Sequence, residues 1–527
     1  MKQLPVFLAA AVIVVSVGSQ PAGAQSAVAL QDRAAARFLD QATWGPTPSS
    51  VAHLQQSGVA NWLAGQFSLN TSDLPDQPLI DPATGMPNRD MTPVQAAFFQ
   101  NTVTGSDQLR QRVAFALSQL WVVSSVATKD AYAFPPYWRL FRDNAFGNYI
   151  DIMKAITLSP AMGTYLNMAN NNKANAATGT SANENYAREL MQLFTVGLNQ
   201  LNPDGSLVLD SSGNPVPTYN QAVVTATARA LTGWTYPTTP GAAARANNPE
   251  YYFGQMFAVE SEHDTTSKII IGGVTIPAGQ TAEQDLSSVL TTLLAQPTMA
   301  PFVSKQLIQH LVTSDPSPAY IQRVSSVFTN NGSGVRGDMK AVITAILMDP
   351  EARAADNPNA TANPNFGHMR EPALFMSNLL RGLNATLGAS SAINVYSTEL
   401  GEDVFAPETV FSYFSPLYTL ENGQPAPEFQ IYSTQTAIDR VDIVNTILYG
   451  ALDKSTTIDL TKFLQNGGSV NAMVGYINYL FMHQAMSGNL QQAAISAAAA
   501  AAAAGPKAEA QAALYIVLSS NEYQIIQ

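Results

Sequence analysis

The sequence predicts a mainly α-helical fold of many helices, with one or two small β-hairpins. Apolar residues recur three and four positions apart along most of the chain from residue 29, which is the spacing of one face of a helix. Proline, glycine and asparagine separate these segments and mark their ends. Two stretches, 202–219 and 268–277, instead combine turn residues with short β-favouring runs.

The helical pattern is clearest in eight segments. Residues 108–126 place Leu109, Val113, Leu117 and Leu120 on one stripe, so this helix is expected to pack in the core. The other segments are 149–158, 183–197, 221–232, 282–295, 300–312, 319–328 and 339–348.

The two non-helical stretches and the alanine-rich segment complete the predicted elements. Residues 202–219 carry Asp-Gly and Gly-Asn turn signals, and 268–277 is expected to form a tight hairpin on Gly272-Gly273. Residues 497–504 are all alanine, which forms helix readily but offers little apolar area to bury. We expect one face of a long peripheral helix or a spacer there, followed by a last helix near residues 510–519.

Residues 1–24 have the composition of a secretory signal peptide. Lys2 supplies a positive start, residues 6–17 are apolar, and Ala22-Gly23-Ala24 is a small-residue cleavage site. This apolar run is shorter than the ~20 residues of a membrane-spanning helix. We therefore expect a secreted or periplasmic protein with no membrane span after cleavage. Residues 25–450 are then the helical core domain and 451–527 a C-terminal helical extension.

Composition excludes several classes of protein. Charged residues make up only 12% of the chain, against about 25% in a typical soluble domain. A net charge of −12 argues against a nucleic-acid partner, because phosphate binding needs a basic face. The absence of cysteine excludes disulfides and cysteine-ligated metals. No P-loop, GxGxxG, GxSxG or HExxH motif is present, so no nucleotide cofactor is expected.

The first candidate site is the charged helix that begins near residue 183. Helical spacing places Glu184 and Arg188 on its polar arc and Glu189 at the edge of its buried arc. Glu184 and Arg188 form an i,i+4 pair worth only ~0.3–0.5 kcal/mol when exposed, so a capped amphipathic helix accounts for them without any function. In the functional interpretation, Arg188 or a histidine holds Glu189 for acid–base or metal chemistry.

The second candidate site is the loop Glu262-His263-Asp264, which is followed by Lys268. A histidine beside an acid on a loop can serve as a general base or bind a metal, although neighbouring charges on loops also arise by chance. If the two candidate sites meet in space, Glu189, His263 and Asp264 are candidate ligands for a divalent metal ion. No other cofactor is indicated.

Arg229 is a third candidate. Its helix is rich in alanine and leucine, so the side chain is either exposed or paired with a carboxylate, and the forked guanidinium geometry suits Glu184 or Glu189. We interpret Arg229 first as the structural partner of a carboxylate; in the functional interpretation, Arg229 and Lys268 are candidate substrate-binding residues.

Other polar residues are expected to be structural. Lys305 and His310 lie on one helix of the core type. We expect the Lys305 side chain to be solvated and the His310 imidazole to be packed. The strings GHMREP at 367–372 and APEFQI at 426–431 are compact polar turns between apolar segments, and we interpret them as turns that lock loops in place.

Several of these strings together resemble one bacterial family, called domain of unknown function 1800. They are ENYAREL at 184–190, ARALTGW at 228–234, the segment 263–268, GDMKAVITAILMDPEAR at 337–353 and GHMREP. The resemblance spans about residues 30–440. It implies a large, exported, predominantly helical protein without an established activity.

The resemblance also bears on partners and site residues. Genes of this family tend to lie beside those of an exported family similar to alkaline phosphatases and sulfatases, so such a protein is a candidate partner. His53, His310 and His483 fall outside the motifs and are not site candidates. The motif residues carried over are Glu184, Arg188, Glu189, Arg229, His263, Asp264 and Lys268.

Two functional hypotheses follow. The first is an envelope or extracellular enzyme of the hydrolase or lyase type that acts on a polymer or glycan. Its catalytic residues would be Glu184, Arg188, Glu189, His263 and Asp264. The second is a non-enzymatic assembly or binding protein that works with the co-exported partner. A third possibility is that these charges only form buried salt bridges.

Overall fold

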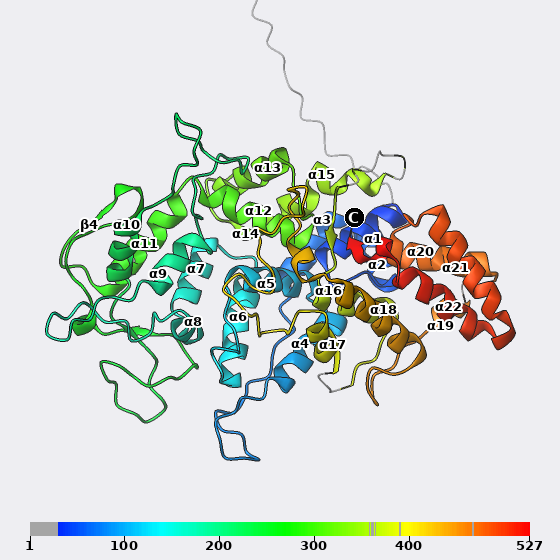
Figure 1. The fold of residues 1–527 in the computed structure, drawn as a ribbon, viewed down its shortest axis with the longest axis horizontal. Helices are drawn as coiled ribbons and strands as arrows, with labels where there is room; N and C mark the ends of the chain where they lie inside the picture. Colours follow the sequence, from blue (N-terminus) through cyan, green and yellow to red (C-terminus); the bar gives the residue numbers. More distant parts are fainter. Residues whose placement is uncertain are drawn as a thin grey trace, which may run out of the picture.

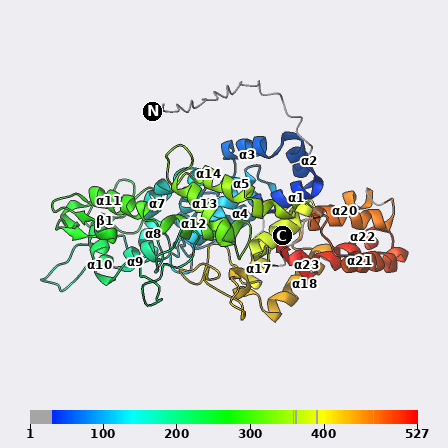
Figure 2. The same cartoon turned by 90° about the horizontal axis from the view of Figure 1, so that it is seen from above.

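The computed structural model describes residues 30–526, except 358, 360–362, 364, 389–391 and 466–467. The expected signal peptide, residues 1–24, lies outside the described residues. The described chain is mainly α-helical, as predicted, with small two-stranded sheets. Figure 1 shows an elongated body, with residues 150–300 at one end and the last helices at the other. Figure 2 shows the same two ends from above.

The first half of the chain supplies one end and the centre of the body. Its helices are α1 (Asp32–Ala42), α2 (Pro48–Ser57), α3 (Val59–Ser68), α4 (Thr92–Thr104), α5 (Gln108–Leu120), α6 (Phe134–Asn144), α7 (Tyr149–Thr157), α8 (Pro160–Tyr165), α9 (Asn185–Gln192), α10 (Gln221–Ala230) and α11 (Ala282–Ala295). Short 3-10 turns lie at Ala131–Ala133, Glu260–Glu262 and Ile271–Gly273.

The second half returns through the centre to the opposite end. Its helices are α12 (Met299–Leu311), α13 (Pro318–Thr329), α14 (Met339–Met348), α15 (Pro350–Arg353), α16 (Pro372–Gly382), α17 (Ala392–Glu399), α18 (Thr434–Tyr449), α19 (Thr461–Gln465), α20 (Val470–Met482), α21 (Gly488–Ala501), α22 (Pro506–Leu518) and α23 (Asn521–Gln524). Further 3-10 turns lie at Ala354–Asp356, Pro427–Ile431 and Ala502–Ala504.

Most predicted helices lie within a few residues of their observed bounds, and 282–295 and 339–348 match them. The helix predicted at 183–197 is shorter, because the backbone of Val196 and Gly197 turns back onto Met191. Gly197 has a φ of +71°, a conformation that ends helices and favours glycine. The helix predicted at 108–126 ends at Leu120.

Within the described residues, three antiparallel pairs make up the regular β-structure. In the predicted hairpin, β3 (Lys268–Ile269) pairs with β4 (Thr275–Ile276), and Gly272 and Gly273 both have positive φ. The strands β1 (Trp234–Thr235) and β2 (Phe257–Ala258) form the second pair. In the third, β5 (His368–Met369) pairs with β6 (Ile525–Ile526). Residues 199–217 form isolated bridges instead of a regular hairpin.

The core is one continuous apolar cluster that contains residues from α1 to β6. Two helices lie deepest: every residue of α16 is buried, and so is every residue of α5 except Ser118. Both helices carry polar side chains into the interior, among them Arg112, Gln119 and Arg381. Buried polar groups need hydrogen-bond partners, so the position of these helices determines where polar sites can form.

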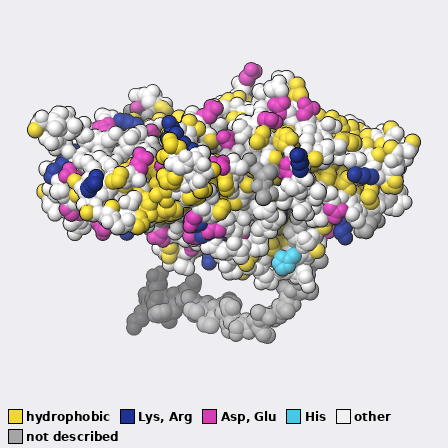
Figure 3. All heavy atoms as spheres, turned by 90° about the horizontal axis from the view of Figure 1, so that it is seen from below, with side chains coloured by type: hydrophobic (Ala, Val, Ile, Leu, Met, Phe, Trp, Pro, Cys, Tyr) yellow, Lys and Arg dark blue, Asp and Glu magenta, His cyan; other side chains and the backbone are white. Residues whose placement is uncertain are grey.

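The surface reflects the low charge of the sequence. Figure 3 shows a face on which charged side chains are sparse and scattered among uncharged polar and apolar ones. In the described part of the chain, no helix has both the length and the apolar character needed to cross a membrane.

We predict that Gly367→Ala strongly destabilises the protein. Gly367 has a φ of +117°, and an added Cβ would lie 2.2 Å from the carbonyl oxygen of Ile526, on β6. Backbone strain and this clash together should lower the free energy of unfolding by roughly 2–4 kcal/mol. Urea denaturation measures this loss.

Gly213→Ala is the matched control. Gly213 also has a positive φ, +83°, but nothing lies within 4 Å of the added Cβ. Only backbone strain remains, which costs about 1–2 kcal/mol. Equal losses in the two variants would contradict the close approach of β6 to Gly367.

Candidate functional site

Glu184 ties the start of α9 to α10. Its carboxylate lies 3.0 Å from the Arg188 guanidinium and accepts hydrogen bonds of 2.7 Å from the Gln221 amide and the Thr225 hydroxyl. The hydrogen bond from Thr225, with contributions from Gln221 and Arg188, lowers the pKa of Glu184 against the effect of burial. Since Glu184 and Arg188 are both partly exposed, this is an ionised cluster that joins two helices at the surface.

Glu189 lies at the edge of the buried face of α9, as the helical spacing predicts. Its Oε2 atom is buried and has no hydrogen-bond partner in the described structure. Burial raises the pKa of Glu189, while the charge of Arg188 opposes this shift. Burial and the nearby Glu189 charge raise the pKa of Tyr165 and of Tyr219 to about 12. The Tyr219 hydroxyl is also buried and unpartnered, so two tyrosines accompany this carboxyl group.

His263 belongs to a buried polar cluster. Its Nδ1 atom lies 2.9 Å from the carbonyl oxygen of Thr232, and its Nε2 atom lies 3.2 Å from Asp285 Oδ2. Lys268 Nζ lies 2.7 Å from the same carboxylate oxygen. The side chains of His263 and Asp285 are fully buried and that of Lys268 is 1% exposed. The three groups therefore join the 263–268 loop to α11, away from solvent.

Asp264 points to a different partner from its neighbour His263. Arg229 donates from Nε to Asp264 Oδ2 at 2.8 Å and from Nη2 to Oδ1 at 3.4 Å. Against the effect of burial, hydrogen bonds from Arg229 and Thr266 hold the pKa of Asp264 well below its usual range. Arg229 does form the forked pair expected of it. Its partner, however, is Asp264, and not Glu184 or Glu189 as the sequence suggested.

Helix α10 therefore links the Glu184 cluster to the Asp264 cluster, but the two clusters are separate. Gln221, which binds Glu184, and Arg229, which binds Asp264, lie roughly 12 Å apart along this helix at 1.5 Å per residue. Across the described residues, no three histidine, aspartate or glutamate side chains are grouped as metal ligands. Glu189, His263 and Asp264 accordingly do not form a shared metal site in this structure.

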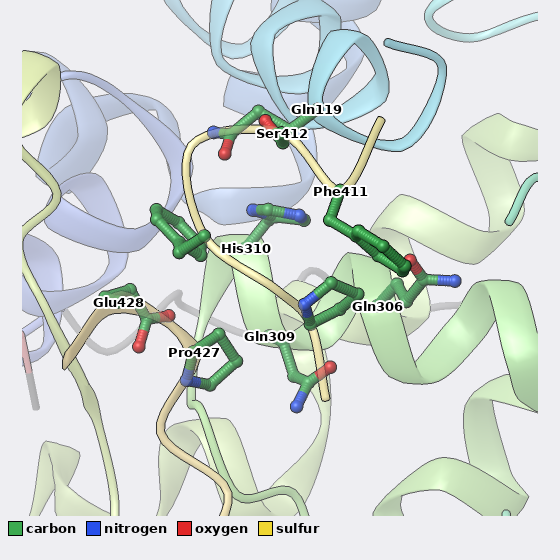
Figure 4. A pocket seen from close by; sticks show the side chains of 10 residues that line it. Gln119, Gln306, Gln309, His310, Phe411, Ser412, Pro427 and Glu428 are labelled. Carbon is green, nitrogen blue, oxygen red and sulfur yellow. The ribbon is translucent and has the colours of Figure 1, made fainter. Parts of the chain in front are cut away.

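A pocket lies elsewhere, where α5 and α12 meet the loop before α18. Its cavity volume is only about 10 Å³, room for about one water molecule, and it is partly open to solvent. Figure 4 shows the polar side chains of the two helices facing the loop residues across it. The lining residues are Gln119, Gln306, Gln309, His310, Phe411, Ser412, Phe414, Pro416, Pro427 and Glu428.

Three glutamine side chains form much of the polar lining. Gln119 donates to Glu371 Oε2 at 2.8 Å, and Gln309 donates to the carbonyl oxygen of Ser314 at 2.9 Å. Gln119 Oε1 and Gln306 Nε2 are buried and have no partner in the described structure. One acceptor and one donor of the lining are thus buried without a hydrogen-bond partner.

Glu428 is the buried carboxyl group of the pocket. The Ser314 hydroxyl donates to its Oε2 atom at 2.8 Å, and His368 Nδ1 lies 3.7 Å from its Oε1 atom. Burial raises the pKa of Glu428 to about 8, and the charge of Glu371 adds to the shift, while Ser314 and Arg112 oppose it. Glu428 is therefore mostly protonated at neutral pH and titrates just above it.

His310 is an uncharged group beside Glu428. Its ring packs against Phe414, with the ring centroids 6.2 Å apart. Burial, and then the charge of Arg112, lowers the pKa of His310 to about 3. The imidazole therefore stays neutral and offers one donor and one acceptor to the pocket.

A layer of buried charges lies behind the pocket. Arg112 Nη1 lies 3.3 Å from Glu371 Oε1, and both side chains are almost fully buried. Arg112 also donates to the carbonyl oxygen of His310 at 2.5 Å. Glu402 accepts a hydrogen bond of 2.8 Å from the backbone in the first turn of α16. Burial raises the pKa values of Glu371 and Glu402, and Arg112 opposes both shifts.

Sequence reasoning missed this pocket. His310 was expected to be a packed imidazole and 426–431 a turn that locks a loop. Both segments do pack, but His310 and Glu428 also line the pocket. The available signal was a lone charge inside an uncharged segment, as for Glu428 after Pro427. Such a charge must find a partner when it is buried.

We predict that Asp285→Ala destabilises the protein far more than Glu184→Ala. Removing the Asp285 carboxylate leaves Lys268 buried without its counter-charge, which typically costs about 3–5 kcal/mol. Glu184 is partly exposed, so its loss should cost less than about 1 kcal/mol. Urea denaturation of both variants compares them. A small loss for Asp285→Ala would contradict a structural role for the cluster of His263, Lys268 and Asp285.

Comparison with known proteins finds one match. The sequence profile of a family described as a protein of unknown function, DUF1800, matches residues 37–525. The match extends beyond the motif strings, which end near residue 440, and includes most of the segment 451–527. No curated protein and no solved structure matches the chain. The chain belongs to the DUF1800 family of proteins of unknown function.

Proposed function

We propose that this protein is an acid–base enzyme of the hydrolase or lyase type that acts on a polymer or glycan at the Glu428 pocket. One observation carries the proposal: a buried carboxyl group with a pKa of about 8 lines a small, partly open pocket. A group whose pKa lies near the working pH can both give and take a proton during a reaction. Strongly shifted carboxyl groups in pockets are frequent at catalytic sites.

The neighbours of Glu428 support a role in proton transfer. The hydrogen bond from Ser314 fixes Oε2 and so restricts the orientation of the carboxyl group. The neutral His310 ring and the Gln119 and Gln306 amides supply hydrogen-bonding groups within the same pocket. In the proposed reaction, Glu428 gives its proton to the leaving group of a substrate bound at the mouth of the pocket.

Arg112 and Glu371 act as positioning residues. Neither lines the pocket, but Glu371 holds the Gln119 amide and Arg112 holds the carbonyl oxygen of His310. The pair therefore fixes two groups of the pocket from behind, which keeps them ordered before a substrate binds.

The proposed location is the cell envelope or the extracellular space. The composition of residues 1–24 supports this location, and polymers and glycans are abundant substrates there. A co-exported protein similar to alkaline phosphatases and sulfatases stays part of the proposal as a candidate partner.

The catalytic role of the motif residues stays a prediction. These residues are Glu184, Arg188, Glu189, His263 and Asp264. Glu189 has the best support, because its Oε2 atom is buried and unpartnered. His263 has the least, because it is fully buried beside Asp285.

We predict that Glu428→Gln lowers kcat by roughly 10²- to 10⁴-fold, the usual contribution of a general acid or base. The amide keeps the shape of the protonated carboxyl group but cannot transfer the proton. A panel of envelope polysaccharides would be incubated with each protein. New reducing ends report hydrolysis, and the ultraviolet absorbance of unsaturated ends reports lyase activity.

Glu408→Gln is the matched control, because Glu408 is exposed on the same loop and should leave the activity unchanged. Equal activity of Glu428→Gln and the parent protein would refute the role of Glu428. Failure of the parent protein on every polymer, with recovery of a stoichiometric partner from envelope extract, would favour the non-enzymatic binding role instead.

We predict that Glu428 makes the stability of the protein fall as the pH rises from about 4.5 to about 8. The folded state raises the pKa of this carboxyl group from 4.5 to about 8, so in this range the folded state binds more protons than the unfolded state. Stability from this group is therefore complete at low pH and is lost as the pH rises. Glu428→Gln removes the ionisation and should flatten the curve.

Urea denaturation of the parent protein and of Glu428→Gln across this pH range checks the prediction. The difference in unfolding free energy between the two proteins should change in favour of the variant as the pH rises. A difference that stays constant would show that Glu428 ionises normally in the folded protein.

A further inference from the structure

We propose that Asn422 is a site of spontaneous covalent modification, at which the side-chain amide is hydrolysed through a cyclic imide. Asn422 is followed by Gly423. The backbone nitrogen of a glycine can approach the preceding side chain closely, because glycine has no Cβ. The pair lies in the 411–428 loop, which also carries Glu428. This inference does not depend on the proposed function.

Asn422 and Gly423 lie in a tight, exposed turn. The Gly423 N–H donates to the carbonyl oxygen of Leu420 at 2.8 Å, and the Leu420 N–H donates to that of Gln424 at 2.9 Å. Gly423 has a φ of +83°, the left-handed conformation that glycine adopts in hairpin turns of this kind. Both Asn422 and Gly423 are exposed, so water and hydroxide ions have access to the turn.

The amide group of Asn422 is loosely held. Its Oδ1 atom accepts a hydrogen bond of 3.0 Å from the Gln424 N–H, and its Nδ2 atom has no partner in the described part of the chain. For the imide to form, the amide must rotate until its carbon atom faces the Gly423 nitrogen. One exposed hydrogen bond is broken by this rotation, and water can replace it.

Asn331-Gly332 is the same pair of residues in a different environment. Asn331 is half-buried, and its Nδ2 atom donates to Asp338 Oδ2 at 2.6 Å. Its Oδ1 atom accepts hydrogen bonds of 2.9 and 3.2 Å from two backbone N–H groups. The Gly332 N–H donates one hydrogen bond, as the Gly423 N–H does, so the two pairs differ mainly in how firmly the amide is held.

The hydrogen bond to Asp338 makes Asn331 the protected member of the comparison. A hydrogen bond to a charged group is stronger than one between neutral groups. Rotation of the Asn331 amide must break this bond as well as those to the backbone. We therefore expect Asn331 to react roughly ten- to a hundredfold more slowly than Asn422.

The reaction consumes one water molecule and releases one ammonia molecule. The Gly423 nitrogen loses its proton to a hydroxide ion and bonds to Asn422 Cγ. The bond between Cγ and Nδ2 then breaks, and Nδ2 leaves as ammonia after taking a proton from water. A water molecule adds to one of the two imide carbonyl carbons, and the bond between that carbon and the Gly423 nitrogen breaks. The product is aspartate or isoaspartate.

Both products change the loop that carries Glu428. Each adds a negative charge next to Glu421. Isoaspartate also lengthens the main chain by one carbon atom inside the turn that the hydrogen bonds of Leu420 close. The loop should therefore change as the protein ages, without the action of another enzyme.

The test incubates the full-length protein in mildly alkaline buffer made with water labelled with oxygen-18, and maps its peptides by mass spectrometry. We expect Asn422 to gain the label and lose its amide at least roughly tenfold faster than Asn331. A third Asn-Gly pair, at 466–467, lies outside the described residues, and its peptide is quantified separately.

Two variants test the two parts of the explanation. Gly423→Ala places a methyl group beside the attacking nitrogen and should slow the reaction at Asn422 severalfold; nothing lies within 4 Å of the added Cβ. Asp338→Ser removes the acceptor of the Asn331 amide, while serine can still cap α14 as Asp338 does. Asn331 should react faster in this variant. Unfolding midpoints verify that both variants are folded.

Three results would overturn the inference: an intact Asn422, a reaction at Asn331 as fast as that at Asn422, or an unchanged rate at Asn422 in Gly423→Ala. An unchanged rate at Asn331 in Asp338→Ser would refute the hydrogen bond to Asp338 as the cause of its protection.

Discussion

The buried ion pair of Arg112 and Glu371 is the constraint on which the centre of the molecule depends. Two charges inside a core are costly to bury, and further hydrogen bonds to their remaining donors and acceptors offset part of that cost. Arg112 on α5 meets Glu371 at the start of α16 and the carbonyl oxygen of His310 in the last turn of α12. The positions of three helices are therefore tied to one guanidinium group, and the pocket lies where two of these helices meet the 411–428 loop.

The same pair also contributes to the protonation states of the pocket groups. The Glu371 charge helps to keep Glu428 protonated, and the Arg112 charge helps to keep His310 neutral. Burial is the larger cause in both cases. A largely uncharged pocket thus lies directly in front of a layer of buried charges. A change in the packing of these charges would therefore also change the protonation of the pocket groups.

Much of the fold could be predicted from the sequence, because apolar spacing and turn residues are local signals. They located the helices α5, α7, α9 to α14 and α22, the hairpin on Gly272-Gly273 and the edge position of Glu189. Side-chain partners are not local. His263 and Asp264 are adjacent, but they turn to Asp285 and Arg229 respectively, and the pocket joins segments near residues 119, 310 and 428. Residue spacing alone cannot show which distant segments meet.

The contacts of Arg370 imply an order of folding. Its guanidinium binds Asp40 on α1 at 2.5 Å and donates to the carbonyl oxygen of Tyr523 on α23. A ribosome makes Asp40 and Arg370 long before Tyr523. Until α23 is present, Arg370 lacks one acceptor and must keep water there, because an unpaired buried charge is unfavourable. Arg370 therefore ties the first helix of the described chain to the last one, and the core between them reaches its final packing only when both are in place.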